Sequence, residues 1–172
     1  MPATHDLIVG SVKIPLDASY SLEQTYEVIE QGAALLRKMD GSAVRQTAYT
    51  KLRSTISGQG KIPPGLASMD FSASFTLYCM APRSIYSAST TVTLPAARRS
   101  DWAPHAYAIV DGRLVKTPIS IATNTGTLTA VSGATGYYTD YYPTLSVFSR
   151  GPVESFNGRG GGASWSLTCE EA

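Results

Sequence analysis

Apolar and polar residues alternate with a period of two along most of this chain. Alternation of this kind is typical of β-strands that bury one face, whereas an amphipathic helix repeats about every 3.6 residues. Residues 21–31 are the best helix candidate but favour strand at least as well, and residues 64–69 are a second candidate for a turn of helix or 3-10 helix. The pattern predicts short strands over residues 7–14, 24–29, 33–39, 43–49, 52–57, 71–79, 85–93, 106–110, 114–123, 127–131, 137–148 and 163–169.

Two Asp-Gly pairs lie between alternating segments, and each pair predicts a β-hairpin. A type I′ turn needs positive φ angles, which Asp and Gly tolerate. Residues 33–57 alternate on both sides of Asp40-Gly41. We therefore expect a long antiparallel hairpin with this turn at its tip, extending past the main body. Asp111-Gly112 predicts a second hairpin.

The polar positions of the first hairpin are mostly basic. Residues 31–61 hold six basic residues and one acid, a net charge of +5, while residues 1–30 hold five acids and one base, a net charge of −4. The two blocks fit either solvated charged faces or complementary patches, within one subunit or between neighbours. On the second interpretation the interface includes Arg37, Lys38, Arg45, Tyr49, Lys51 and Arg53 on the basic side and Glu23 and Glu27 on the acidic side.

The composition fits a single globular β domain. The 172 residues are 43% hydrophobic and 16% charged, which is enough apolar surface for a core. Many short strands with glycine and proline turns predict a mainly β fold, either a sandwich or a barrel. We expect one domain over residues 1–172, with residues 95–136 as an exposed loop or hairpin excursion. Cys79 and Cys169 are expected to be buried thiols, since two cysteines make no disulfide framework.

The sequence predicts neither catalysis nor a cofactor. His5 and His105 have no second ligand at metal spacing, and no nucleophile motif is present. Residues 158–163 match a dinucleotide fingerprint in letters, but they precede a strand-like segment where the fingerprint needs a helix. A formal charge of +1 gives no drive toward nucleic acid or a membrane, and no apolar run is long enough to span a bilayer. We expect a non-enzymatic protein without catalytic, cofactor or metal residues, made in the cytoplasm and soluble there.

A tyrosine-rich segment carries the other candidate site. Residues 136–148 read GYYTDYYPTLSVF, and aromatic rings on a β-sheet can stack on sugar rings. The alternative is that these residues form an edge or interface strand. The candidate glycan platform consists of Trp102, Tyr137, Tyr138, Tyr141 and Tyr142.

Three segments resemble tail proteins of tailed bacteriophages. The first is LLRKMDGSAVRQTAYTKLRSTISGQGKIPPGL at residues 35–66, in which an Arg-Met-Asp-Gly type of hairpin precedes a basic strand and a Pro-Pro-Gly turn. The others are TLYCMAPRSI at residues 76–85 and GASWSLTCEEA at residues 162–172. None of these segments is a catalytic signature.

The resemblance implies a structural protein of the virion, similar to distal tail or baseplate ring proteins at the tail tip. It further implies a β-sandwich or split barrel related to the tail-tube fold, a homo-oligomeric ring that is usually a hexamer, and contacts with tail tube, hub and fibre proteins. The protein would be made in the host bacterial cytoplasm and located in the virion tail. A tail-tube, tail-completion or capsid decoration role stays open, as does a carbohydrate- or receptor-binding sandwich.

The last predicted strand should belong to the core although it is terminal. Alternation places Ala163, Trp165, Leu167 and Cys169 on one face, with polar residues on the other.

Overall fold

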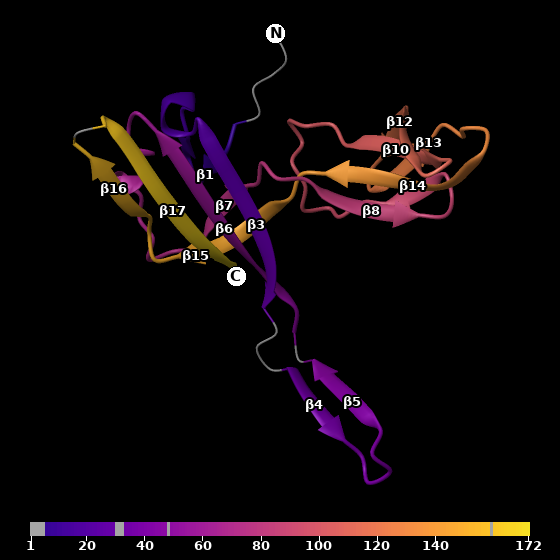
Figure 1. Cartoon of the computed structure of the whole chain (residues 1–172). Helices are drawn as coiled ribbons and strands as arrows, with labels where there is room; N and C mark the ends of the chain where they lie inside the picture. The colour runs from indigo at the N-terminus through magenta and orange to yellow at the C-terminus, as the bar shows by residue number, and fades with distance from the viewer. Residues whose placement is uncertain (1–5, 30–32, 48, 159) are drawn as a thin grey trace. The chain divides into compact units, whose positions relative to one another are not determined.

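The computed structural model describes residues 6–29, 33–47, 49–158 and 160–172, and it is mainly β (Figure 1). The chain divides into two compact units. The first unit comprises Met1–Ile8 and Leu77–Leu145, and the second comprises Val9–Thr76 and Ser146–Ala172. Where the sequence predicts one domain with an excursion at residues 95–136, these residues lie inside the first unit.

The elements are short strands joined by turns. The strands are β1 (Ile8–Val9), β2 (Val12–Lys13), β3 (Ser21–Ile29), β4 (Ala33–Arg37), β5 (Ala43–Thr47), β6 (Lys51–Gly60), β7 (Phe75–Tyr78), β8 (Arg83–Ser87), β9 (Thr91–Thr93), β10 (His105–Val110), β11 (Arg113–Thr117), β12 (Ile119–Ala122), β13 (Thr125–Leu128), β14 (Ala134–Tyr141), β15 (Thr144–Ser149), β16 (Val153–Asn157) and β17 (Gly162–Glu171). Two 3-10 helices are η1 (Leu16–Ala18) and η2 (Leu66–Ser68), of which the second was expected from the sequence.

One eight-stranded sheet includes most strands of the second unit. Its order is β2-β1-β7-β15-β17-β6-β3, with β16 paired to β17 beside this path. The C-terminal strand β17 is central, because it pairs antiparallel with β6 along nearly its whole length and also with β15 and β16. The predicted buried face of this strand is confirmed: Ala163, Trp165, Leu167 and Cys169 are all buried. The Trp165 indole donates to the Ala18 carbonyl oxygen at 2.8 Å.

Strands β4 and β5 pair as a separate two-stranded antiparallel sheet, called here the β4–β5 hairpin. The neighbouring strands β3 and β6 are also antiparallel partners. Ile29 pairs with Lys51 and Ala33 pairs with Thr47, so three residues separate these pairs on each strand and one register holds on both sides.

The turn of the β4–β5 hairpin differs from the predicted type I′. The Gly41 amide donates to the Lys38 carbonyl, the Lys38 amide donates to the Ser42 carbonyl, and Gly41 alone within this turn has a positive φ, of 80°. This geometry is a type I turn followed by a left-handed glycine, in a three-residue loop. The Asp40 side chain fixes it, because its Oδ1 accepts hydrogen bonds from the amide and the hydroxyl of Ser42 at 2.9 and 2.6 Å.

The first unit contains two further sheets. One has the order β11-β10-β14-β8 and the other the order β12-β13-β9. Apolar residues of both sheets form one core, so the unit is a two-layer sandwich. Its buried members are Val92, Leu94, Ala106, Ala108, Leu128, Tyr137 and Tyr141.

Pro118 divides one predicted strand into two strands of different sheets. Strand β11 ends at Thr117 and β12 begins at Ile119, and proline between them has no N–H for a ladder. The Thr117 hydroxyl and the Pro118 carbonyl both bond to Thr129, which fixes the corner. At the other end of β11 lies the predicted hairpin, in which Asp111 and Gly112 have φ values of 49° and 74°, as in a type I′ turn.

Candidate functional site

The β4–β5 hairpin carries exposed apolar side chains beside its basic ones. Leu35 is 69% exposed, Leu36 is 50% exposed and the Met39 side chain is fully exposed. Arg37 and Lys38 are exposed as well. Within the described chain, the two strands of this hairpin have only each other as ladder partners.

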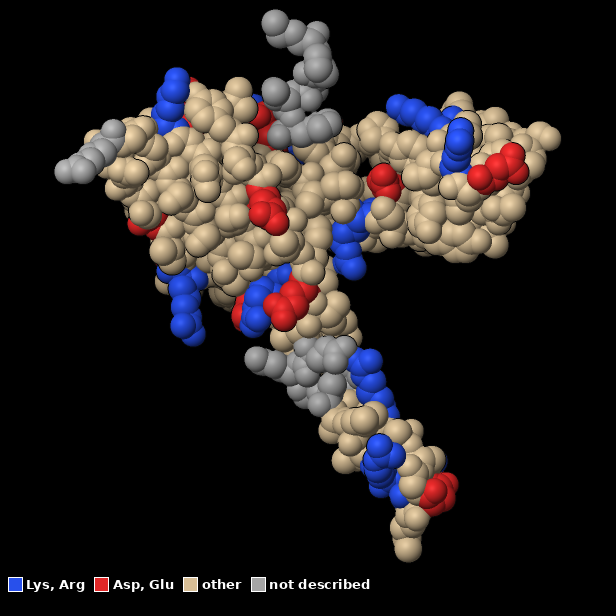
Figure 2. Space-filling view, viewed as in Figure 1, with Lys and Arg blue, Asp and Glu red and all other residues tan. Residues whose placement is uncertain are grey.

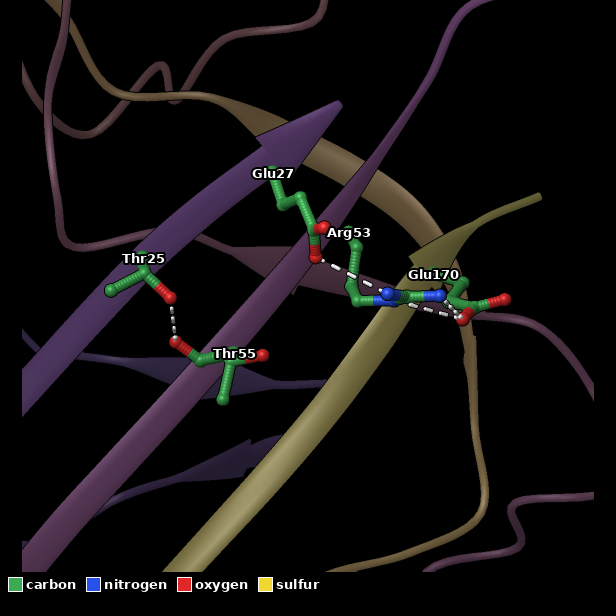
Figure 3. A network of polar contacts seen from close by, with 5 residues as sticks. All are labelled: Thr25, Glu27, Arg53, Thr55 and Glu170. Carbon is green, nitrogen blue, oxygen red and sulfur yellow. Dashed lines mark hydrogen bonds and ion pairs between the residues drawn. The ribbon is translucent and has the colours of Figure 1, made fainter. Parts of the chain in front are cut away.

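Arg53, predicted as an interface residue, forms ion pairs within its own chain (Figure 3). It lies on β6 directly opposite Glu27 of β3 and Glu170 of β17. Its Nη1 donates to Glu27 at 3.2 Å, while its Nε and Nη2 donate to one oxygen of Glu170 at 3.0 and 2.8 Å. Hydrogen bonding and charge from Glu170, followed by those from Glu27, raise the pKa of Arg53. At this position the acidic and basic blocks meet inside one subunit.

The other predicted interface residues are distributed over the second unit. Lys51 donates from its Nζ to the Ala172 backbone oxygen at 2.5 Å, so it is also engaged within the chain. Glu23 is exposed on β3, which is the last strand of its sheet. Tyr49 is 45% exposed, and Arg45 is exposed on β5.

A groove of about 790 Å³ lies over the Arg53 ion pairs. Charged and polar residues of β3, β6 and β17 contribute to its lining. Its lining includes Thr55, Thr168, Phe71, Phe148, Arg150 and Val153.

The five residues of the predicted glycan platform do not share one surface. Tyr137 and Tyr141 are each 7% exposed and belong to the core of the sandwich. Tyr138 faces away from the core, while Tyr142 packs edge-on against Trp102 with 4.3 Å between ring centroids. Alternation along β14 therefore separates rings that are adjacent in sequence.

A different set of tyrosines is brought together on the outer face of the sheet β11-β10-β14-β8. Tyr107 pairs with Tyr138, and Tyr138 pairs with Tyr86, so three adjacent strands present a tyrosine side by side. We call these three residues the tyrosine row. Tyr86 is 55% exposed and Tyr138 is 38% exposed, and their ring centroids are 5.6 Å apart. The sequence pattern did not indicate Tyr86 and Tyr107, because they lie in segments distant from Tyr138 and become its neighbours only through strand pairing.

Polar groups flank the tyrosine row on the same face. Asp140 lies opposite His105 on one side and Ser84 on the other, and it accepts a hydrogen bond from the Ser84 hydroxyl. Burial raises the pKa of Tyr142, and the negative charge of Asp140 raises it further. Asp140 lies two residues after Tyr138 on β14, so it is on the same face as the tyrosine row.

A buried arginine supports this end of the sandwich. Arg99 is 3% exposed, and its guanidinium donates to both carboxylate oxygens of Asp101 at 3.0 and 2.6 Å. The same guanidinium donates to the carbonyl oxygens of Asp6, Tyr78 and Cys79. It lies 4.1 Å from the centre of the Trp102 ring, a cation–π contact. The predicted platform residue Trp102 thus packs against a structural cation on one side.

The charged side chains in view in Figure 2 are scattered in both signs, and basic side chains follow the β4–β5 hairpin. Among the residues described, no three His, Cys, Asp or Glu side chains gather as a metal site would require. No helix formed by the described residues is long and apolar enough to cross a membrane. Cys79 and Cys169 are buried thiols.

Comparison of the chain with protein-family models, with curated proteins and with solved structures finds no match.

Proposed function

We propose that this chain is a non-enzymatic structural protein of a bacteriophage tail that assembles with copies of itself into a ring at the tail tip. The resemblance of residues 35–66, 76–85 and 162–172 to phage tail proteins supports the tail assignment. On this proposal the fold is a relative of the tail-tube fold, the ring is a hexamer, and tube, hub and fibre proteins are its further partners in the virion.

The observation that supports self-assembly best is the exposed apolar surface of the β4–β5 hairpin. A two-stranded hairpin is at best marginally stable in water on its own, and leucine side chains favour burial. Leu35 and Leu36 are exposed although they point to opposite faces of β4. Open strand edges are also liabilities in a monomer, and a neighbouring copy removes them by pairing. In the proposed ring this hairpin extends past the main body and is covered by the next subunit.

A ring follows from the kind of contact proposed. If the hairpin of one copy meets a different surface of the next copy, the contact is heterologous, and such contacts close into rings or continue as filaments. Basic Arg37, Lys38 and Arg45 on the hairpin and acidic Glu23 on the edge strand β3 have the opposite signs that such a contact would use.

Light scattering after size-exclusion chromatography tests the proposal. We expect the wild-type chain to have a mass several times its 18.3 kDa, with ring-shaped particles in negative-stain images. Replacing Leu35 and Leu36 together by Ser should weaken assembly more than tenfold, because each buried leucine is worth about 1.5–3 kcal/mol. A monomeric wild-type protein, or a double variant that assembles normally, would refute the role of the hairpin.

Leu114→Ser is the matched control, since Leu114 is a 60% exposed leucine of another hairpin. Its assembly should match that of the wild type. Charge reversal belongs at Arg45 rather than Arg53, because Glu at position 53 would lie between Glu27 and Glu170 and destabilise the subunit itself. Arg45→Glu and high salt should both reduce assembly if the charges contribute, while an oligomer indifferent to both would restrict the contact to apolar packing.

A further inference from the structure

The tyrosine row is a platform whose rings are held in place. A side chain at Gly136 would come within 2.6 Å of the Tyr86 ring, so the ring lies directly over the glycine of the neighbouring strand. Tyr138 holds the same ring edge-on from β14. Glycine weakens a strand interior and often marks a place where something approaches the backbone closely. Here Gly136 leaves room for the exposed Tyr86 ring to pack against the backbone of β14.

The tyrosine row spans three neighbouring strands, and the Tyr86 and Tyr138 rings are inclined to each other by 63°. Neighbouring strands lie about 4.8 Å apart, so the tyrosine row from β10 to β8 is about 10 Å wide. Tyr86 at one end stays more than half exposed. This width matches the length of about two linked sugar rings, whose C–H faces stack on aromatic rings.

The polar groups beside the row supply hydrogen bonds. The Ser84 hydroxyl donates to Asp140, which leaves further acceptor positions on a carboxylate that has about four. His105 lies opposite Asp140 on β10, and Ser84 lies opposite it on β8. Acceptors and donors at the edge of stacked rings match the hydroxyl groups that project from the rim of a sugar ring.

The charges of this face favour a neutral ligand. Asp140 and Lys116 are the charged residues at its described positions, one of each sign, and Lys116 lies at the far end of the row beside Tyr107. The Asp140 carboxylate beside the row disfavours a phosphate backbone, although aromatic rings also stack on bases. A polyanion therefore fits less well than an uncharged chain.

We propose that the outer face of the sheet β11-β10-β14-β8 binds a neutral oligosaccharide, with Tyr86, Tyr138 and Tyr107 stacking on sugar rings and Asp140 accepting sugar hydroxyls. The site goes beyond ring assembly and does not depend on it.

An array of neutral glucans, galactans, mannans and N-acetylglucosamine chains tests the proposal on the full-length protein, with sulfated and uronic-acid glycans and single-stranded oligodeoxynucleotides as charged probes. The strongest neutral oligosaccharide is then titrated by calorimetry. We expect Tyr86→Ala and Tyr138→Ala each to weaken binding about tenfold, and Asp140→Ala to weaken it by a similar factor. Tyr86→Phe keeps the ring and should stay within about threefold of the wild type.

Tyr20→Ala is the matched control, because Tyr20 is 53% exposed but belongs to the second unit. It should bind as the wild type does. Circular dichroism and the oligomer mass should be unchanged in Tyr86→Ala, which separates this site from assembly. Absence of binding to every neutral glycan, a preference for anionic glycans or oligodeoxynucleotides, or binding that survives loss of Tyr86 and Tyr138 would overturn the proposal. If Tyr86→Ala loses its fold, the comparison of Tyr138→Ala and Tyr86→Phe decides the outcome.

Discussion

Single side chains fix the turns and corners of this molecule. Arg99 is the largest case, because one guanidinium serves a carboxylate, three carbonyl oxygens and an indole ring. Only arginine offers five donors in a plane that also stacks on an aromatic ring, so lysine could not replace it. Asp40 acts on a smaller scale by bonding to Ser42 within the β4–β5 hairpin.

The Asp40 turn leads to a prediction about pKa. Hydrogen bonds from the Ser42 hydroxyl and amide lower the pKa of Asp40 below its usual value, although the carboxylate is exposed. A depressed pKa means that the turn gains stability above the pKa of the unfolded chain and loses it as the pH falls through the folded value. Ser42→Ala should raise the Asp40 pKa toward normal in an NMR titration.

Asp70 is the internal control for this titration. Ser72 lowers the Asp70 pKa by the same pair of hydrogen bonds. The Asp70 pKa should be unchanged in Ser42→Ala. If the Asp40 pKa is unchanged as well, the Ser42 hydroxyl is not the cause of its lowered value.

At the scale of elements, the pairing of β6 with β17 organises the second unit. Gly58 lies opposite Trp165, and a side chain at position 58 would come within 2.6 Å of the indole. The indole therefore covers the glycine and reaches η1 through its hydrogen bond to Ala18. Because the residue opposite Trp165 is a glycine, the large indole fits against β6 and the C-terminal strand can pair along it.

Gly58→Ala should destabilise the second unit by about 1–3 kcal/mol, because overpacking forces the indole out of its position. Thermal unfolding and tryptophan fluorescence measure the loss and the ring displacement. Gly158→Ala is the matched control, since a Cβ there meets nothing within 4 Å. Equal stability of the Gly58 and Gly158 variants would show that Trp165 has room to shift.

Local patterning predicted the elements better than their boundaries. The strands with one buried face, such as β6 and β17, were found because alternation reports burial directly. Strand β16 was missed because all its residues are exposed, so its sequence carries no buried face. The hairpin predicted at Asp111-Gly112 is confirmed, while the type I′ turn predicted at Asp40-Gly41 is wrong, because a side-chain bond to Ser42 selects another turn.

At the scale of the whole molecule, the sequence did not predict two units. Most of the first unit is an insertion between residues 76 and 146 of the second, and Met1–Ile8 also belong to it. Contacts between residues distant in sequence define this division. The same reason hid the tyrosine row, since Tyr86 and Tyr138 belong to segments that meet only in the folded sheet. Sequence reasoning found the aromatic segment but not its partners.

The inserted unit should fold by itself. It has its own core across two sheets, and the chain segments that enter and leave it are joined by the hydrogen bond from the Cys79 amide to the Pro143 carbonyl at 3.0 Å. A chain of residues 77–145 should therefore show a strand-type circular dichroism spectrum and a cooperative thermal transition. A spectrum of an unfolded chain would mean that the insertion needs the rest of the protein. Leu128→Ala, which opens the core, is the control that should abolish the transition.

The shared register of β3 with β6 and of β4 with β5 has a kinetic consequence. Pairing can begin at the Asp40 turn and proceed from β4–β5 to β3–β6 in the same register. The sequence separation of the paired residues then grows in small steps, so each new pair adds little loop-closure entropy. The pairing of Ile56 with Leu167, in contrast, joins the middle of the chain to its end. During synthesis β3 can therefore pair with β6, and β4 with β5, before β17 has left the ribosome. Until β17 arrives, β6 has an open edge that a chaperone or a second chain can occupy.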